Sequence, residues 1–126
     1  MKNYLFCIML FLLLPVISCD ARSVAVFEET IHDFGKINKE TSVKHTFKFR
    51  NAGNGTLIIE RIKAGWGCTG TLLSDKEIPA GGSGQLEIEL HTDMKTGEIV
   101  KTIYVFTNDP DHKQIKIIVK ATVLDE

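Results

Sequence analysis

The fold class is decided by the stretch Val43-Lys44-His45-Thr46-Phe47-Lys48-Phe49-Arg50. Successive side chains of a strand point to opposite faces, so residues at every second position share a face. One face of this stretch would carry Val43, His45, Phe47 and Phe49. The other face would carry Lys44, Thr46, Lys48 and Arg50. The pattern therefore predicts a strand with one face in a core and the other in contact with water.

Six more segments on either side of this strand predict extended structure. They are residues 24–27, 31–37, 56–62, 85–91, 98–106 and 115–124. Runs of Asn, Gly, Asp and Pro at residues 51–55 and 108–111 are typical of turns, and no segment has the apolar period of a helix. We expect one all-β domain over residues 24–126, an immunoglobulin-like β-sandwich of about seven strands. Residues 98–106 should be a central strand, because both of their faces are apolar.

The chain begins like an exported bacterial protein. Lys2 precedes an apolar run from Tyr4 to Leu14, and Pro15 ends this run. The run is shorter than the ~20 apolar residues that span a bilayer. Its length and flanks predict a signal peptide over residues 1–18 rather than an uncleaved membrane anchor.

Cys19 ends a Val-Ile-Ser-Cys sequence that resembles the lipobox of bacterial lipoproteins. We expect its thiol to receive diacylglycerol and residues 19–23 to form a short tether. Because two or more acyl chains give stable anchoring, the predicted location is the cell envelope, lipid-anchored on the periplasmic side or at the cell surface. Cleavage after Ala21, which would release a soluble periplasmic or secreted protein, is the alternative.

Charge and motifs exclude several classes of function. The formal net charge is −1 and there is no basic run, so no nucleic-acid partner is expected. Gly65-Trp66-Gly67-Cys68-Thr69-Gly70 fits the dinucleotide pattern G-x-G-x-x-G. The following residues, 71–79, are too short for the helix that such a site needs. We expect a loop here and no bound cofactor.

Cysteine and histidine chemistry is sparse in the predicted mature chain. Cys68 is the one cysteine left after the signal peptide and the lipid site, so the lipoprotein form can make no internal disulfide. Trp66 and Cys68 are singled out as a candidate interaction or thiol site. No catalytic group and no metal site are predicted, because no histidine pairs with another at a ligand spacing along the chain. The histidines are His32, His45, His91 and His112.

A series of short motifs, taken in order, resembles a family of bacterial envelope proteins. They are Asp33-Phe34-Gly35-Lys36-Ile37, residues 43–53, Leu57-Ile58-Ile59, Gly67-Cys68-Thr69, Ile78-Pro79-Ala80-Gly81, Gly97 and Thr107-Asn108-Asp109-Pro110. The family is known as a domain of unknown function, number fifteen-seventy-three, and is related in fold to PapD-like and ciliary immunoglobulin-like modules. The resemblance covers Phe27 to Val123 and implies the same sandwich fold. Where the family usually reads Cys-Gly-Cys-Thr, this chain has Trp66 in place of the first cysteine, so no two-cysteine site is expected.

The sequence alone names no function. It favours a non-catalytic interaction or structural module tethered at the envelope, whose sheet edges could bind an extended partner strand. A thiol- or metal-handling role of Cys68 is the alternative. Carbohydrate binding through Trp66, Tyr104 and Phe106 is a weaker one.

Overall fold

The computed structural model describes residues 21–64, 68–92 and 96–125, with the backbone alone for Cys68 and Thr69. Within these residues the chain forms nine strands and no helix, so it contains no helix that could cross a membrane. The strands are β1 (Ala25–Phe27), β2 (Ile31–Ile37), β3 (Ser42–Asn51), β4 (Leu57–Ala64), β5 (Cys68–Leu73), β6 (Glu77–Ile78), β7 (Ser83–His91), β8 (Gly97–Thr107) and β9 (Gln114–Val123).

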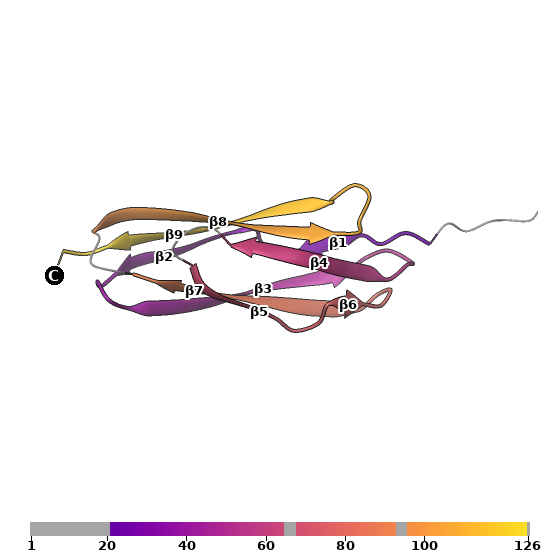
Figure 1. Ribbon diagram of the computed structural model, residues 1–126, viewed down its shortest axis with the longest axis horizontal. Helices are drawn as coiled ribbons and strands as arrows, with labels where there is room; N and C mark the ends of the chain where they lie inside the picture. The colour runs from indigo at the N-terminus through magenta and orange to yellow at the C-terminus, as the bar shows by residue number, and fades with distance from the viewer. Residues whose placement is uncertain (1–20, 65–67, 93–95, 126) are drawn as a thin grey trace, which may run out of the picture.

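The strands form two sheets that lie face to face (Figure 1). The first sheet has the order β1-β3-β7-β5, and all of its pairs are antiparallel. The second has the order β2-β9-β8-β4-β6, in which only β2 and β9 run parallel. This arrangement confirms the predicted all-β sandwich. It also confirms that residues 98–106 lie in a central strand, because β8 has β9 on one side and β4 on the other.

The core forms where the two sheets bury their inward faces against each other. Phe47 and Phe49 of β3 are 0% and 2% exposed, as their alternation predicted. The other sheet and β7 complete the core with Leu86, Ile88, Leu90, Ile103, Val105, Ile117 and Val119, all at most 1% exposed. Burying one large aliphatic or aromatic side chain contributes about 1.5–3 kcal/mol. This shared apolar layer is therefore the main force that holds the sheets together.

Two strands were not predicted, so the expected number of about seven was too low. β5 begins inside the Gly65–Gly70 stretch that was expected to be a loop. Its sequence, Cys-Thr-Gly-Thr-Leu-Leu, does not alternate between apolar and charged residues. β6 has two residues, too few for any alternation to be read. Both are edge strands. An edge strand pairs with a neighbour on one side only, so its sequence carries a weak pattern of alternation.

Asn51 ties together three loops at one end of the sandwich. Its side chain is fully buried, and its Oδ1 accepts hydrogen bonds from the backbone N–H groups of Val24 (3.1 Å) and Gly53 (3.0 Å). Its Nδ2 donates to the carbonyl oxygens of Gly55 (2.6 Å) and Ile78 (3.0 Å). These four bonds satisfy backbone groups of residues that flank or end the strands, and an unpaired buried group would cost about 1–3 kcal/mol.

The side chain of Asp109 satisfies a backbone group of the N-terminal segment in the same way. It is 1% exposed, and its carboxylate accepts hydrogen bonds from the backbone N–H of Ala25 (2.9 Å) and of Asp111 (2.9 Å) and faces Nδ1 of His112 (2.9 Å). Burial alone would raise the pKa of Asp109. The hydrogen bonds and the nearby His112 outweigh burial and hold this pKa below its ordinary value of 3.8.

Asn108 extends this contact to the start of the described chain. Its Oδ1 accepts hydrogen bonds from the backbone N–H of Ile58 (2.8 Å) and from Oγ of Ser23 (3.0 Å). Ser23 is 5% exposed although it lies in the predicted tether, residues 19–23. Ser23 therefore packs against the sandwich.

The packing around Gly84 generates a first prediction. A Cβ at this position would lie 2.5 Å from Cζ of Phe49 and 2.9 Å from Cδ1 of Ile78, whereas a Cβ at Gly70 would meet no atom within 4 Å. We expect Gly84→Ala to destabilise the protein by about 1–3 kcal/mol, the usual cost of overpacking a core. Gly70→Ala, the matched control, should stay within about 0.5 kcal/mol of the wild type. Urea unfolding of both variants measures the difference, and equal stability of the two would contradict the packing described.

The lowered pKa of Asp109 predicts how stability depends on pH. A carboxyl whose pKa is lower in the folded state stabilises the fold fully above its unfolded pKa, and this contribution is lost as pH falls through the folded pKa. We expect the wild type to lose stability below about pH 4 more steeply than Asp109→Asn. The exposed neighbour substitution Asp111→Asn should keep the wild-type slope. Urea midpoints measured from pH 7 to pH 3 test this, and parallel curves for the wild type and Asp109→Asn would refute it.

Candidate functional site

Most residues singled out from the sequence fall outside the part of the chain that the structure describes. Cys19 and Trp66 lie outside the described residues, as does the predicted signal peptide, residues 1–18. Cys68 begins β5, and its backbone pairs with that of Leu90. The lipidation of Cys19 and the thiol site at Trp66 and Cys68 therefore stay predictions.

The two other aromatic residues considered for sugar binding lie on β8. Tyr104 and Phe106 are both half-buried. The guanidinium carbon of Arg61 lies 4.2 Å from the centroid of the Phe106 ring, so the arginine covers one face of this ring. A sugar platform needs open ring faces, and Phe106 has one of its faces covered.

Three of the four sheet edges are protected against pairing with another chain. β1 has three residues and β6 has two, which makes both poor templates. β2 changes register between Asp33 and Lys36, where Gly35 takes a φ of 76° and donates its N–H to Oδ1 of Asp33. Positive φ favours glycine, and short strands and bulges are common devices that protect an edge.

β5 is the least protected of the four edges, because its register shift lies at its start and the residues that follow pair regularly. Its six residues include no charged residue and no proline. After a register shift between Cys68 and Gly70 it pairs regularly with β7 as far as Leu73. Leu72 lies opposite Glu87 and is 66% exposed, more than any other large hydrophobic residue that the structure describes. β5 therefore presents backbone N–H and C=O groups and an apolar side chain to whatever approaches this edge.

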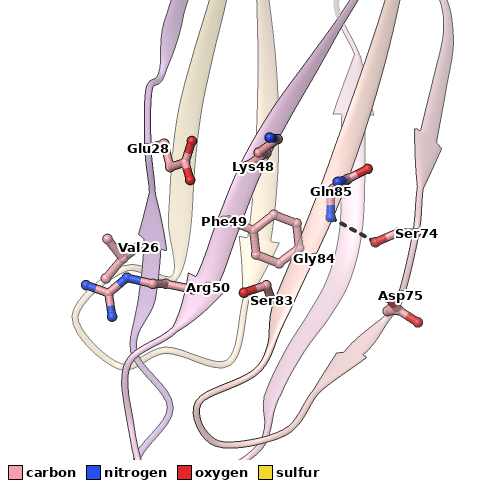
Figure 2. A pocket seen from close by; sticks show the side chains of 10 residues that line it. All are labelled: Val26, Glu28, Lys48, Phe49, Arg50, Ser74, Asp75, Ser83, Gly84 and Gln85. Carbon is pink, nitrogen blue, oxygen red and sulfur yellow. Dashed lines mark hydrogen bonds between the residues drawn. The ribbon is translucent and has the colours of Figure 1, made fainter.

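The first sheet also carries a shallow hollow. Figure 2 shows it reaching from β1 across β3 and β7 to Ser74 and Asp75, the residues that follow β5. Its volume is about 370 Å³, and its charged residues are of both signs: Glu28, Lys48, Arg50 and Asp75. Ser74 accepts a hydrogen bond from the backbone N–H of Gln85 at 2.8 Å. The hollow therefore offers charged and hydroxyl groups for polar contacts.

Three residues that sequence reasoning missed come together on the flank of the sandwich formed by β2 and β3. The imidazole rings of His32 (β2) and His45 (β3) stack with centroids 3.5 Å apart and an interplanar angle of 8°. Glu29, in the connection between β1 and β2, contacts Nε2 of His45 through its carboxylate. The ligand atoms of the three residues lie within 4.8 Å of one another.

Two phenylalanines fix the orientation of the stacked rings. Phe34 meets His32 edge-on at 4.7 Å and 83°, and Phe47 meets His45 edge-on at 4.8 Å and 82°. Burial and then the nearby His45 lower the pKa of His32, although the carboxylates of Glu29 and Asp33 oppose this shift. The shift favours the neutral imidazole, the form in which a ring nitrogen has a free lone pair.

Distance along the chain explains why no sequence pattern indicated this cluster. Glu29 and His32 are near neighbours, but His45 is thirteen positions further on and belongs to the other sheet. Alternation showed that His45 shares the inward face of β3. It could not show which residue of the opposite sheet would lie against it.

Comparison with solved structures shows the immunoglobulin-like fold. A protein of unknown function from Porphyromonas gingivalis W83 matches with a TM-score of 0.71 and 24% identity over 87% of this chain. This chain spans about half of that protein, 51% of its length. The PapD-like domain 7 of human CEP192 matches with a TM-score of 0.63 and 8% identity over 90% of this chain and 94% of that domain. The VesB protease of Vibrio cholerae matches with a TM-score of 0.62 and 8% identity over 78% of this chain and 31% of that protein.

The sequence comparisons give the family. No curated protein matches the chain. The profile of the family described as "Protein of unknown function (DUF1573)" matches residues 25–123, which include all nine strands of the sandwich. The match confirms the resemblance seen in the motifs from Asp33-Phe34-Gly35 to Thr107-Asn108-Asp109-Pro110. This chain therefore belongs to the DUF1573 family, and its fold is the immunoglobulin-like sandwich that this family shares with PapD-like domains.

Proposed function

We propose that this protein is a non-catalytic binding module that takes up an extended segment of a partner protein along β5. The observation that carries the proposal is the contrast between the four sheet edges. β1, β2 and β6 are short or bulged, whereas β5 is uncharged and exposes Leu72. An added strand would continue the order β1-β3-β7-β5 by one position, with its backbone hydrogen bonds giving affinity and its side chains giving selectivity.

The chemistry of the edge defines the partner. The regular pairing of β5 runs from Gly70 to Leu73, so the partner segment would be short and extended. An apolar side chain beside Leu72 would remove its exposed surface from water, at about 25 cal/mol per Å². Each backbone hydrogen bond adds about 0.5–1.5 kcal/mol net. Such a site has modest affinity, which a shared anchorage of both partners would raise by increasing their local concentration.

The anchorage that supports this proposal is the lipid expected on Cys19. Ser23 is already bonded to Asn108 within the domain, so only three residues, 20–22, would separate Cys19 from it, a distance of four residue steps. At ~3.5 Å per residue, this tether reaches no more than about 14 Å. The domain would then sit close to an envelope membrane, with the loops around Asn51 and Asn108 nearest to it. The C-terminal end, which lies at the opposite end of the long axis, would point away (Figure 1).

Crosslinking from two exposed apolar positions tests the binding edge. A photocrosslinking residue in place of Leu72 should form an adduct with a second protein in cells that make this chain. The same residue in place of Val100, which is 58% exposed on the other sheet, should form none. Adding Gly70→Lys should reduce the adduct at position 72, because lysine on an edge strand discourages pairing.

Two results would count against a partner strand at this edge. One is an adduct of the same mass and yield from both positions. The other is an adduct of twice the mass of the chain, which would make the occupant of β5 a second copy of this protein.

Substituting the lipidated residue tests the anchorage. Cys19→Ser removes the thiol that would receive diacylglycerol, so the protein should move from the membrane fraction to the soluble fraction or accumulate unprocessed. Mass spectrometry of the wild-type N-terminus should show an acylated Cys19. A mature N-terminus at Arg22 would instead indicate the soluble periplasmic or secreted form.

A further inference from the structure

We propose that Glu29, His32 and His45 bind one transition-metal dication, with Zn²⁺ or Cu²⁺ as the best matched, and that this ion joins the two sheets. Two imidazoles and one carboxylate are a ligand set that suits late first-row metals. The three ligand atoms already lie within 4.8 Å of one another. Three protein ligands would leave at least one coordination position to water.

The ligand atoms need to move little to bind an ion. A zinc ion binds imidazole nitrogen at about 2.0–2.1 Å, so at the tetrahedral angle two nitrogens on one ion lie about 3.3–3.4 Å apart. The present limit of 4.8 Å means a shift of about 1.5 Å at most for any pair. Because each lone pair lies in the plane of its ring, the parallel rings of His32 and His45 would also have to tilt toward each other.

The surroundings of the cluster permit this movement. Glu29 lies in a connection between strands and its side chain is 43% exposed, so its carboxylate can follow an ion without disturbing the core. His45 is 23% exposed, which gives a solute access to the ring. Phe34 and Phe47 contact the two rings edge-on, and Phe47 is fully buried. Apolar side chains beside the ligands lower the local dielectric constant, which strengthens the attraction between a dication and the carboxylate.

The position of the cluster gives the ion a structural role. β2 and β3 belong to different sheets, and Glu29 lies where the chain crosses from one sheet to the other. An ion bound by all three residues would therefore link both sheets on the flank opposite β5. Because it would bind only the folded chain, it would raise stability with its free concentration. This inference does not depend on the binding edge, which lies on the other side of the sandwich.

The test is a Zn²⁺ titration of tag-free, metal-stripped protein by calorimetry, followed by thermal unfolding with and without the ion. We expect one ion per chain and a higher Tm when it is bound. Glu29→Gln and His45→Ala should each weaken binding by about ten-fold or more and reduce the Tm shift. The matched controls are Glu28→Gln, the adjacent exposed carboxylate, and His91→Gln, a histidine outside the cluster, and both should keep the wild-type affinity.

Two further measurements distinguish binding at this cluster from binding at other residues of the chain. Electron paramagnetic resonance of the Cu²⁺ form should show coupling to two imidazole nitrogens, and one of them should disappear in His45→Ala. Cys68→Ser should bind Zn²⁺ like the wild type. Loss of binding in Cys68→Ser with retention in Glu29→Gln and His45→Ala would overturn the proposal and favour the thiol. Absence of stoichiometric binding in the wild type would also overturn it. If His45→Ala does not fold, Glu29→Gln, whose side chain lies outside the core, decides alone.

Discussion

The whole structure depends on two sheets that each have one apolar face and can bury it only against the other. Phe47 and Phe49 on one side and Ile117 and Val119 on the other are excluded from water only while the sheets stay together. A sandwich closed in this way has no room for a substrate between its layers. Function must therefore lie on its edges, its flanks, its ends or its outer faces, and each of these has a different chemistry in this protein.

One end of the sandwich is occupied by structural polar groups. Asn51, Asn108 and Asp109 each satisfy several backbone groups of loops that come from distant parts of the sequence. These residues belong to the Asn-Ala-Gly and Asn-Asp-Pro motifs through which the sequence resembles its family. Their buried hydrogen bonds explain the motifs as a way of closing one end of the fold around the N-terminal segment. The same contacts fix the position from which any lipid tether would leave.

The sequence predicted those parts of the fold in which one strand face is buried and the other is wet. β3, β7 and β9 all follow this rule, and Phe47 and Phe49 of β3 were placed in the core from alternation alone. β5 and β6 were not predicted, because an edge strand packs against fewer neighbours and its sequence need not alternate between apolar and polar residues. The cluster of Glu29, His32 and His45 was not predicted for another reason. Period-two alternation assigns a residue to a face, but it does not say which residue of the other sheet that face will meet.

The two proposals place function on the two flanks of the sandwich. On one flank, stacked histidine rings and a carboxylate lie where the two sheets meet; on the other, β5 ends its sheet, with no further strand beside it among the described residues. The open edge is the central claim, and residue-resolved hydrogen exchange of the free protein tests it most directly. The account predicts slow exchange along β3, β7, β8 and β9, and alternation between slow and fast amides from Gly70 to Leu73, because every second amide faces away from β7. Uniformly slow exchange along β5 would show that its outer side is already paired, and would contradict the account.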